Sequence, residues 1–457
     1  MAATSTAANN TTWLQKLQDN PQSLEFATPT VALTLVVLIL VPVVASLLFG
    51  GRRSNLPVAN PPKLLQSMRQ KQFEFAKDGM KILSEARARF RGKPFILITN
   101  TGPFTILPPE KAHEIRNMQQ LNHRKVFSDS IPNWMTGIGT FAILDHPTEF
   151  LQKAITKHLS KRLNTVTEPL ALEASFAVKT VLRDSSDWTE VKIYDAILDI
   201  VARLSSRVFL GPDVCRNEDW LDLTKNYAQV QTEAIRTLQL FPSILRPLVY
   251  LLHTPCQTAR KEWHRANSIV MPAVEQRRKE RQECVAKGTP LPIYNDAIDW
   301  AEAEVNGAPY SPTDLQLMLS FAAIHTSTDL TCQTLIHLAA NPKCIGALRE
   351  EMLEVLPVAG WKKTSLTNLR LLDSAIKEAQ RLKPIQMTTM VRKVTADTEL
   401  EGGIILRKGE NVAVDNFNLM NPAIHKNPEI FDIYRFYEAR NQPGGEHRAQ
   451  LVATTVE

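Results

Sequence analysis

The chain has 457 residues, of which 44% are hydrophobic and 22% charged, and its formal net charge is +6. This composition suffices for a large core in one to three domains. Basic residues are scattered or paired with acidic ones, without an aromatic-studded basic stripe, so nucleic acid is excluded as an expected partner. The five cysteines are widely spaced and contain no C-x-x-C pair, which indicates a reducing compartment around most of the chain.

The first predicted element is a membrane anchor at Val31–Phe49, a run of 19 residues without a charged side chain. A helix of this length spans about 28 Å, close to the roughly 30 Å hydrocarbon core of a bilayer. A cleavable signal peptide would have a basic start and a shorter apolar run. The basic pair Arg52 and Arg53 follows the run, so the positive-inside rule places residues 1–30 in the lumen and the body in the cytosol. A buried core helix is the alternative.

Two features flank this anchor. Asn9 and Asn10 each begin an Asn-X-Thr glycosylation sequon on the predicted lumenal side, although this pattern is common. Residues 50–62 contain three prolines and are expected to form a semi-rigid hinge. Residues 63–457 then form the expected cytosolic domain.

Helical periodicity dominates this domain. Lys63–Phe90 is amphipathic, and Lys93–Pro109 alternates and turns like two short strands. Helical patterns then fill most of Glu149–Leu356. Its most apolar part, Ile235–Leu252, is broken by two prolines and belongs either to the core or on a bilayer surface, with the core favoured.

The longest predicted helix is well delimited. Ser311 is a suitable N-cap, Pro312 fits the first helical position, and the helix runs to Asn341, where a proline stops it. Four polar residues, His325 to Thr328, interrupt its apolar middle. Either the hydroxyls bond back to carbonyls one turn earlier, or the four residues form a polar notch that faces a buried ligand.

Glu378 and Arg381 lie three residues apart on a predicted helix that ends before Pro384, so their side chains share a face and can pair. The same spacing recurs in three other charged helical stretches, at Glu233/Arg236, Glu262/Arg265 and Glu275/Arg278. Taken alone, the pattern therefore indicates an ordinary surface ion pair. Short alternating runs follow at Met387–Asn416 and predict a small β-region.

The order of these features resembles a cytochrome P450. It comprises the anchor and hinge, a long helix with Ala-Ala-Ile-His-Thr, the E-x-x-R pair, a β-region with "LRKGENV", and then "NPEIFDIYRF". More narrowly, the chain is similar to microsomal P450s of filamentous fungi that oxidise terpenoid and related secondary metabolites. The resemblance implies a mainly α fold with small β-regions, haem b, a lipophilic small-molecule substrate and electrons from NADPH-cytochrome P450 reductase. It also implies a single-pass location in the endoplasmic reticulum membrane.

The resemblance assigns roles to individual residues. Glu378, Arg381 and Arg435 match a three-residue clamp, in which charge-assisted hydrogen bonds hold a loop rigidly. Arg392 matches a position that commonly binds a haem propionate. Ala322 and Ala323 match the small residues of the oxygen-binding groove. Thr326 would relay protons there, with His325 in the place of the usual acidic residue.

The resemblance also implies a substrate pocket. The residues that fall at its expected positions are all apolar, and plain core packing is the alternative for each: Trp134, Phe321, Ile324, Ile385 and Met387.

One departure from the family is large. A P450 holds its haem iron by a cysteine thiolate, which the family supplies from a loop after the "FDIYRF" region, whereas the last cysteine here is Cys344. We therefore assign no metal ligand, expect the C-terminal end of the fold to be missing, and expect no competent monooxygenase from this chain alone. A truncated gene product, a decayed enzyme and a haemless protein that binds a lipophile or a partner at a membrane are the explanations.

Overall fold

The computed structural model describes residues 54–64, 66–129 and 134–445. The chain divides into two compact units, residues 1–55 and residues 56–457, and only the second unit is described below. The anchor at 31–49 and the sequons at Asn9 and Asn10 lie outside the described residues and stay predictions. Within the described ranges, no helix is both long and apolar enough to cross a bilayer.

The first described helix, α3 (Met68–Phe90), confirms the amphipathic pattern at the start of the domain. A capping box begins it, because the Ser67 hydroxyl accepts a hydrogen bond from the Gln70 amide at 3.2 Å and the Gln70 side chain accepts one from the Ser67 amide at 2.9 Å. Its buried residues, which include Phe75 and Leu83, pack against the neighbouring strands.

A five-stranded sheet has the strand order β1-β2-β7-β4-β3. Its strands are β1 (Phe95–Thr99), β2 (Gly102–Leu107), β3 (Leu121–Asn122), β4 (Thr388–Val394) and β7 (Asn411–Asp415). Strands β2 and β7 are parallel, with Thr105 opposite Val412, so the sheet joins an early segment of the chain to a late one. A separate hairpin pairs β5 (Thr398–Leu400) with β6 (Ile404–Leu406). The predicted strands near residue 100 and the β-region after residue 387 are confirmed.

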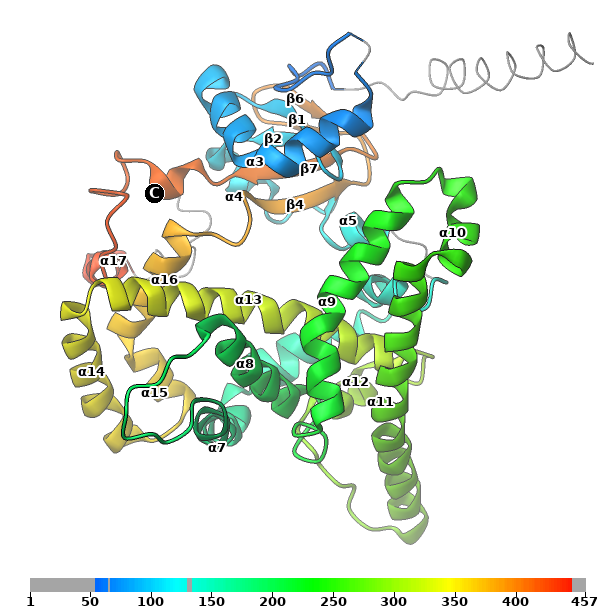
Figure 1. The fold of residues 1–457 in the computed structure, drawn as a ribbon, viewed down its shortest axis with the longest axis vertical. Coiled ribbons are helices and arrows are strands. Elements are labelled where there is room, and N and C mark those ends of the chain that lie inside the picture. The colour runs from blue at the N-terminus through cyan, green and yellow to red at the C-terminus, as the bar shows by residue number, and fades with distance from the viewer. Residues whose placement is uncertain (1–53, 65, 130–133, 446–457) are drawn as a thin grey trace, which may run out of the picture. The chain divides into compact units, whose positions relative to one another are not determined.

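The helical region is built around α13 (Pro312–Ala340), which runs across it in Figure 1. The Ser311 hydroxyl accepts a hydrogen bond from the Asp314 amide at 3.1 Å, as expected of the N-cap. Its main neighbours are α8 (Ile193–Phe209), α9 (Glu218–Gln239), α11 (Thr254–Lys287) and α16 (Arg370–Leu382). The first part of α13 is buried on most of its sides, from Leu315 to Ser320, which is why apolar residues there are not confined to one face.

Further helices complete the unit. They are α4 (Ala112–Ile115), α5 (Arg124–Ser128), α6 (Phe150–Lys153), α7 (Leu163–Leu182), α10 (Arg246–Leu252), α12 (Ala297–Glu304), α14 (Lys343–Ala359), α15 (Lys363–Asn368) and α17 (Arg435–Asn441). Short 3-10 or π turns are η1 (Pro109–Lys111), η2 (Gly139–Asp145), η3 (Ala154–Ser160), η4 (Ser243–Leu245) and η5 (Phe417–Met420).

The core assignment of Ile235–Leu252 is wrong for much of that segment. Helix α9 ends at Gln239, and α10 buries only Val249 and Tyr250. Six large apolar side chains of the segment are exposed: Leu240, Ile244, Leu245, Leu248, Leu251 and Leu252. The two prolines divide the stretch into short pieces, and a short helix at the edge of the helical region buries one face only. Hydrophobicity alone did not distinguish this edge from the core.

Candidate active site

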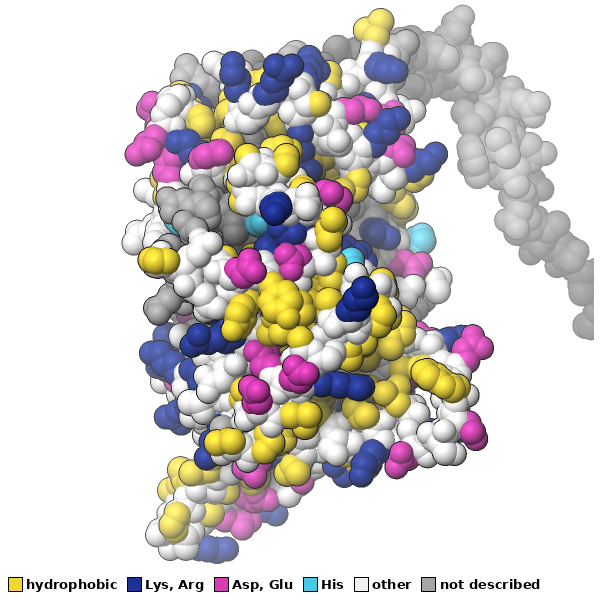
Figure 2. All heavy atoms as spheres, turned by 90° about the vertical axis from the view of Figure 1, so that its left-hand side faces the viewer, with side chains coloured by type: hydrophobic (Ala, Val, Ile, Leu, Met, Phe, Trp, Pro, Cys, Tyr) yellow, Lys and Arg dark blue, Asp and Glu magenta, His cyan; other side chains and the backbone are white. Residues whose placement is uncertain are grey.

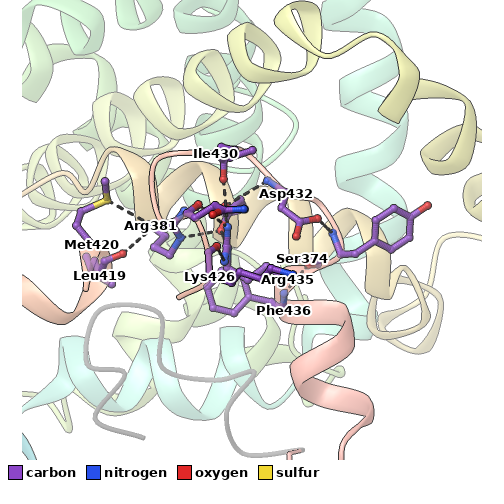
Figure 3. A network of polar contacts seen from close by, with 12 residues as sticks. Ser374, Arg381, Leu419, Met420, Lys426, Ile430, Asp432, Arg435 and Phe436 are labelled. Atoms are coloured by element: carbon purple, nitrogen blue, oxygen red, sulfur yellow. Dashed lines mark hydrogen bonds and ion pairs between the residues drawn. The ribbon is translucent and has the colours of Figure 1, made fainter. Parts of the chain in front are cut away.

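Glu378 is the centre of a buried ion network. Its partners Arg381 and Arg435 are labelled in Figure 3. Its carboxylate accepts two hydrogen bonds from Arg381, at 2.8 Å each, and two from Nε of Arg435, at 3.0 Å each. The Asp432 amide adds a fifth hydrogen bond at 3.2 Å. The side chains of Glu378 and Arg381 are fully buried, and that of Arg435 is 11% exposed. Two guanidinium groups therefore share one buried carboxylate.

The remaining donors of the two arginines hold the segment between β7 and α17. Arg381 donates from Nη1 to the Leu419 carbonyl at 2.7 Å. Arg435 donates to the Lys426 carbonyl at 2.8 Å and to two further carbonyls, those of Asn427 and Ile430. Backbone carbonyls in a loop need such donors when they lack a strand partner. The network thus fixes the path of residues 419–435 against α16.

Two of the other pairs with the same spacing, Glu262/Arg265 and Glu275/Arg278, have no such environment. Arg265 lies 3.4 Å from Glu262 and also pairs with two aspartates, with its side chain 33% exposed. Arg278 pairs with Glu302 instead of Glu275. Exposed ion pairs of this kind contribute little to stability. The surface-pair interpretation therefore suits Glu262 and Arg265, and the clamp interpretation suits Glu378, Arg381 and Arg435.

His425 lies close to the charges of this network, although no sequence pattern singled it out. Its side chain is buried, and its Nε2 atom has no hydrogen-bond partner among the described residues. Burial and the nearby charges of Arg381 and Arg435 lower the pKa of His425 to about 4. The imidazole is therefore neutral near pH 7, which avoids adding a third positive charge to the clamp.

Helix α13 presents an open face at the predicted oxygen-binding groove. Ala322 is exposed, and Ala323 and Thr326 are partly exposed on the same side of the helix. The Thr326 hydroxyl donates to the Ala322 carbonyl at 2.6 Å, and Thr328 donates to the Ile324 carbonyl at 2.7 Å. The hydroxyls therefore bond back along the helix, and the open face around Thr326 is formed by small side chains.

His325 lies on a different flank of α13 from Thr326. Its Nδ1 atom is 3.4 Å from the hydroxyl of Tyr194 on α8. Burial lowers the pKa of His325 and raises that of Tyr194, so both side chains are neutral near pH 7. The structure thus gives His325 a partner on α8 that no sequence pattern indicated.

Arg392 has the character of an anion-binding residue. It lies on β4, is partly buried and donates to the Val391 carbonyl at 2.9 Å. In the described part of the chain, no carboxylate pairs with it, and burial lowers the pKa of its guanidinium. A half-buried cation without a counter-charge is costly, and an anionic ligand group would relieve that cost.

The five predicted pocket residues are not brought together as one group. Ile385 and Met387 line a common cavity of about 320 Å³ between α3, the β1–β2 pair and the start of β4. Phe321 packs edge-on against Phe141, with ring centroids 5.1 Å apart. Trp134 packs against Tyr250 in the same manner at 5.5 Å.

Ile324 does not line this cavity. It is fully buried in a small cluster with Ala202 of α8 and Leu221 of α9. Core packing, the alternative for this residue, is therefore what the structure shows.

Comparison with known proteins identifies the family. A family model described as "Cytochrome P450" matches residues 105–451. The chain belongs to the cytochrome P450 family. It is 37% identical to the Cytochrome P450 monooxygenase hepE of Aspergillus oryzae over 93% of this chain and 78% of that protein. It is 35% identical to the Cytochrome P450 monooxygenase TRI1 of Fusarium sporotrichioides over 89% and 74%.

One further sequence relative and one solved structure are also similar to this P450. It is 34% identical to the Dihydro-ML-236C monooxygenase mlcC of Penicillium citrinum, over 88% of this chain and 78% of that one. The fold is similar to that of a retinoic acid bound cyanobacterial CYP120A1, with a TM-score of 0.59 and 17% identity over 88% and 90% of the two chains. The sequence matches support a monooxygenase role of the kind found in fungal secondary metabolism.

The P450 family implies a haem. The residues of this chain suit the distal side and a propionate of that group but do not supply its axial ligand. The open face at Thr326 and the unpaired guanidinium of Arg392 suit the distal side and a propionate. None of the five cysteines lies in the segment after the clamp, where the family has its axial thiolate. Cys215, Cys256 and Cys332 are buried, Cys344 packs in the α14–α16 cluster, and Cys284 is in the last turn of α11. Burial also raises the pKa of the first three thiols, which disfavours thiolates.

Proposed function

We propose that the protein is a haem-thiolate monooxygenase that inserts oxygen into a lipophilic secondary metabolite, of terpenoid or meroterpenoid type, in a fungal pathway. The observation that carries the proposal is the clamp: Glu378, Arg381 and Arg435 form the charge network expected of a P450 with every partner in place. Buried ion networks are poor stabilisers by themselves and are retained where geometry matters.

The proposal requires an axial cysteine that none of the five cysteines of this sequence supplies. The clamp, the open face of α13 and Arg392 support the proposal of a haem site, and the axial ligand is not among these residues. The metabolite class rests on the resemblance to fungal secondary-metabolism P450s, because the apolar residues near Met387 favour a lipophile without specifying one.

The membrane and the electron donor are part of the same proposal. The apolar run at 31–49 would anchor the protein in the endoplasmic reticulum membrane, and the exposed leucines of α10 would suit a bilayer surface. NADPH-cytochrome P450 reductase would supply electrons. On the face drawn in Figure 2, basic and acidic side chains are interspersed, so a reductase docking there would meet mixed charges.

The test uses the product of the natural gene, made in a host supplied with haem. We expect the reduced, carbon-monoxide-treated protein to show a thiolate-haem absorption band. If the folded protein shows no such band, the monooxygenase proposal is wrong.

A second function is favoured by one observation, the cavity that forms beside Met387 without any haem ligand. In that case the protein is catalytically inactive and binds a lipophile or a partner enzyme at a membrane. Stable expression of the 457-residue chain with saturable lipophile binding and no haem would support it. Rapid degradation without binding would exclude it.

A further inference from the structure

The cavity between α3 and the start of β4 has the composition of a site for a neutral lipophile. Phe75 and Leu83 of α3 and Leu97 of β1 supply apolar walls. Thr99, Asn100 and Gln386 supply hydroxyl and amide groups at its edge. None of the described residues that line the cavity carries a charge, so a charged ligand group would lose its hydration without compensation.

One wall of this cavity is held from outside by Arg87, a residue of α3 that does not line it. Arg87 donates from Nη2 to Asp415 at 2.5 Å and from Nε to the same carboxylate at 3.0 Å. The same Nη2 donates to the Asn416 side chain at 2.8 Å and reaches the Met387 carbonyl at 3.4 Å. Asn416 in turn donates to the Gln386 carbonyl at 2.9 Å.

This network connects three separate parts of the chain: helix α3, the end of β7, and residues 386–387 before β4. Residues 386–387 have no strand partner among the described residues, because the pairing of β4 with β7 begins at Thr388. The carbonyls of Gln386 and Met387 therefore depend on Asn416 and Arg87 for their hydrogen bonds. The Arg87 side chain is 21% exposed and that of Asp415 is 8% exposed, so the ion pair is partly protected from water.

Gly79 determines how closely the opposite wall approaches. A Cβ atom at Gly79 would lie 3.2 Å from the Met387 terminal methyl and 3.2 Å from the Phe75 ring. A side chain there would therefore require Met387 or Phe75, both of which line the cavity, to shift. Gly79 thus allows α3 to approach Met387 closely, and Arg87 holds residues 386–387 in that position.

We propose that Arg87 is a positioning residue, which fixes the Gln386–Met387 wall of a cavity that binds a neutral lipophile with one hydrogen-bonding end. The volume of about 320 Å³ lies at the small end of ligand pockets, which suits a compact terpenoid alcohol or ketone. The identification of this ligand with the metabolite that the enzyme oxidises rests on the proposed function, whereas binding itself does not require a haem.

The experiment uses the full chain in lipid nanodiscs and a photoreactive diazirine analogue of farnesol, a neutral sesquiterpene alcohol. After illumination, mass spectrometry maps the labelled peptides. We expect saturable labelling of α3 and of residues 385–391. Arg87→Ala should raise the half-saturating probe concentration about tenfold, because the wall loses its hydrogen-bonded hold.

Three further variants separate positioning from general stability. Asn416→Ala removes the bond to the Gln386 carbonyl but leaves the ion pair, so it should weaken labelling by severalfold. Arg87→Lys should give an intermediate effect, because an ammonium retains the charge but not the fork of donors. Gly79→Leu should abolish labelling with the network intact, and the control Arg89→Ala, at an exposed position of the same helix, should have no effect.

The inference is overturned if labelling falls outside α3 and residues 385–391, or if Arg87→Ala and Asn416→Ala leave the half-saturating concentration unchanged. Circular dichroism and thermal unfolding of each variant identify any loss of fold. If Arg87→Ala does not fold, Asn416→Ala and Gly79→Leu decide the outcome. Saturable labelling without a thiolate-haem band would support lipophile binding in the cavity and contradict the proposed function. A thiolate-haem band without labelling would support the proposed function and contradict lipophile binding in the cavity.

Discussion

Glu378 is the side chain on which the clamp depends most, because its carboxylate accepts hydrogen bonds from two arginines and one backbone amide. All of these donors are buried or nearly so. Removing the carboxylate charge would leave two guanidinium groups facing each other in a region of low dielectric constant. The clamp is therefore sensitive to loss of charge even where the shape of the side chain is kept.

For Glu378→Gln we expect the free energy of unfolding to fall by about 3–5 kcal/mol, the cost typical of breaking a buried ion pair. Denaturant unfolding monitored by circular dichroism measures this. The matched control is Glu262→Gln, because Glu262 has the same spacing to Arg265 on an accessible surface and should lose about 1 kcal/mol or less. Equal losses in the two variants would contradict the distinction between clamp and surface pair.

His425 makes the stability of the clamp depend on pH. Its pKa in the folded protein is about 4, against an ordinary value of 6.5. Above pH 6.5 both folded and unfolded forms are neutral at this site, and stability is complete. As pH falls from 6.5 to 4, the unfolded state binds a proton that the folded state excludes, so stability decreases.

We expect His425→Phe to reduce the loss of stability between pH 6.5 and pH 4 by up to about 3 kcal/mol. Phenylalanine retains an aromatic ring beside Phe436, which His425 contacts edge-on. Unfolding free energies measured across this pH range provide the test. Parallel pH profiles in the two proteins would show that the burial of His425 does not govern this dependence.

At the scale of elements, α13 is the part of the structure on which the site depends. It contacts α8, α9, α11 and α16, and it presents Thr326 on its open face. Its first turn is capped by the Ser311 hydroxyl. Fraying at this end would disturb the packing of Leu315 and Leu319, both of which are buried in the largest apolar cluster.

Ser311→Ala should therefore lower the free energy of unfolding by about 1 kcal/mol, the usual value of an N-cap hydroxyl. Ser327→Ala is the control, because Ser327 is exposed in the middle of the same helix, where alanine is the better helix former. Chemical denaturation of both variants measures the difference. The capping account fails if the two substitutions have the same effect.

At the scale of the whole described unit, the parallel pairing of β2 with β7 joins an early and a late segment of the chain. It brings Ile106 beside Ala413, although about three hundred residues separate them in the chain. Such non-local pairing couples the early and late parts of the unit. Strand β4, which follows Met387 and contains Arg392, pairs with β7, and β7 is paired in turn with β2. The position of β4 therefore depends on segments from the early and the late part of the described chain.

Val414→Ala, a cavity-forming change in β7, should cost roughly 2 kcal/mol and reduce hydrogen-exchange protection of the β2 amides. The control is Leu348→Ala, which removes a comparable buried side chain from the α14–α16 cluster. We expect that variant to leave the protection of β2 largely unchanged. Equal loss of protection in both would indicate that the unit opens only as a whole.

Local patterns in the sequence were sufficient for the cap of α13, the strands near residue 100 and the β-region after residue 387. These features depend on neighbours within a few residues, such as the hydroxyl of Ser311 and the amide of Asp314. The order of motifs, together with the resemblance that it carries, was sufficient for the family. By itself, the sequence also determined that no cysteine follows Cys344.

Only the tertiary structure decided which residues face one another. It separated the buried clamp from a surface pair of the same spacing, because burial depends on what packs over a helix and not on the helix itself. It placed Ile324 in the core, His325 beside Tyr194 and the leucines of α10 on the surface. It also connected Arg87 to Met387, a contact between residues 300 positions apart that no local pattern contains. Long-range contacts arise from packing of the whole chain, and local spacing does not encode them.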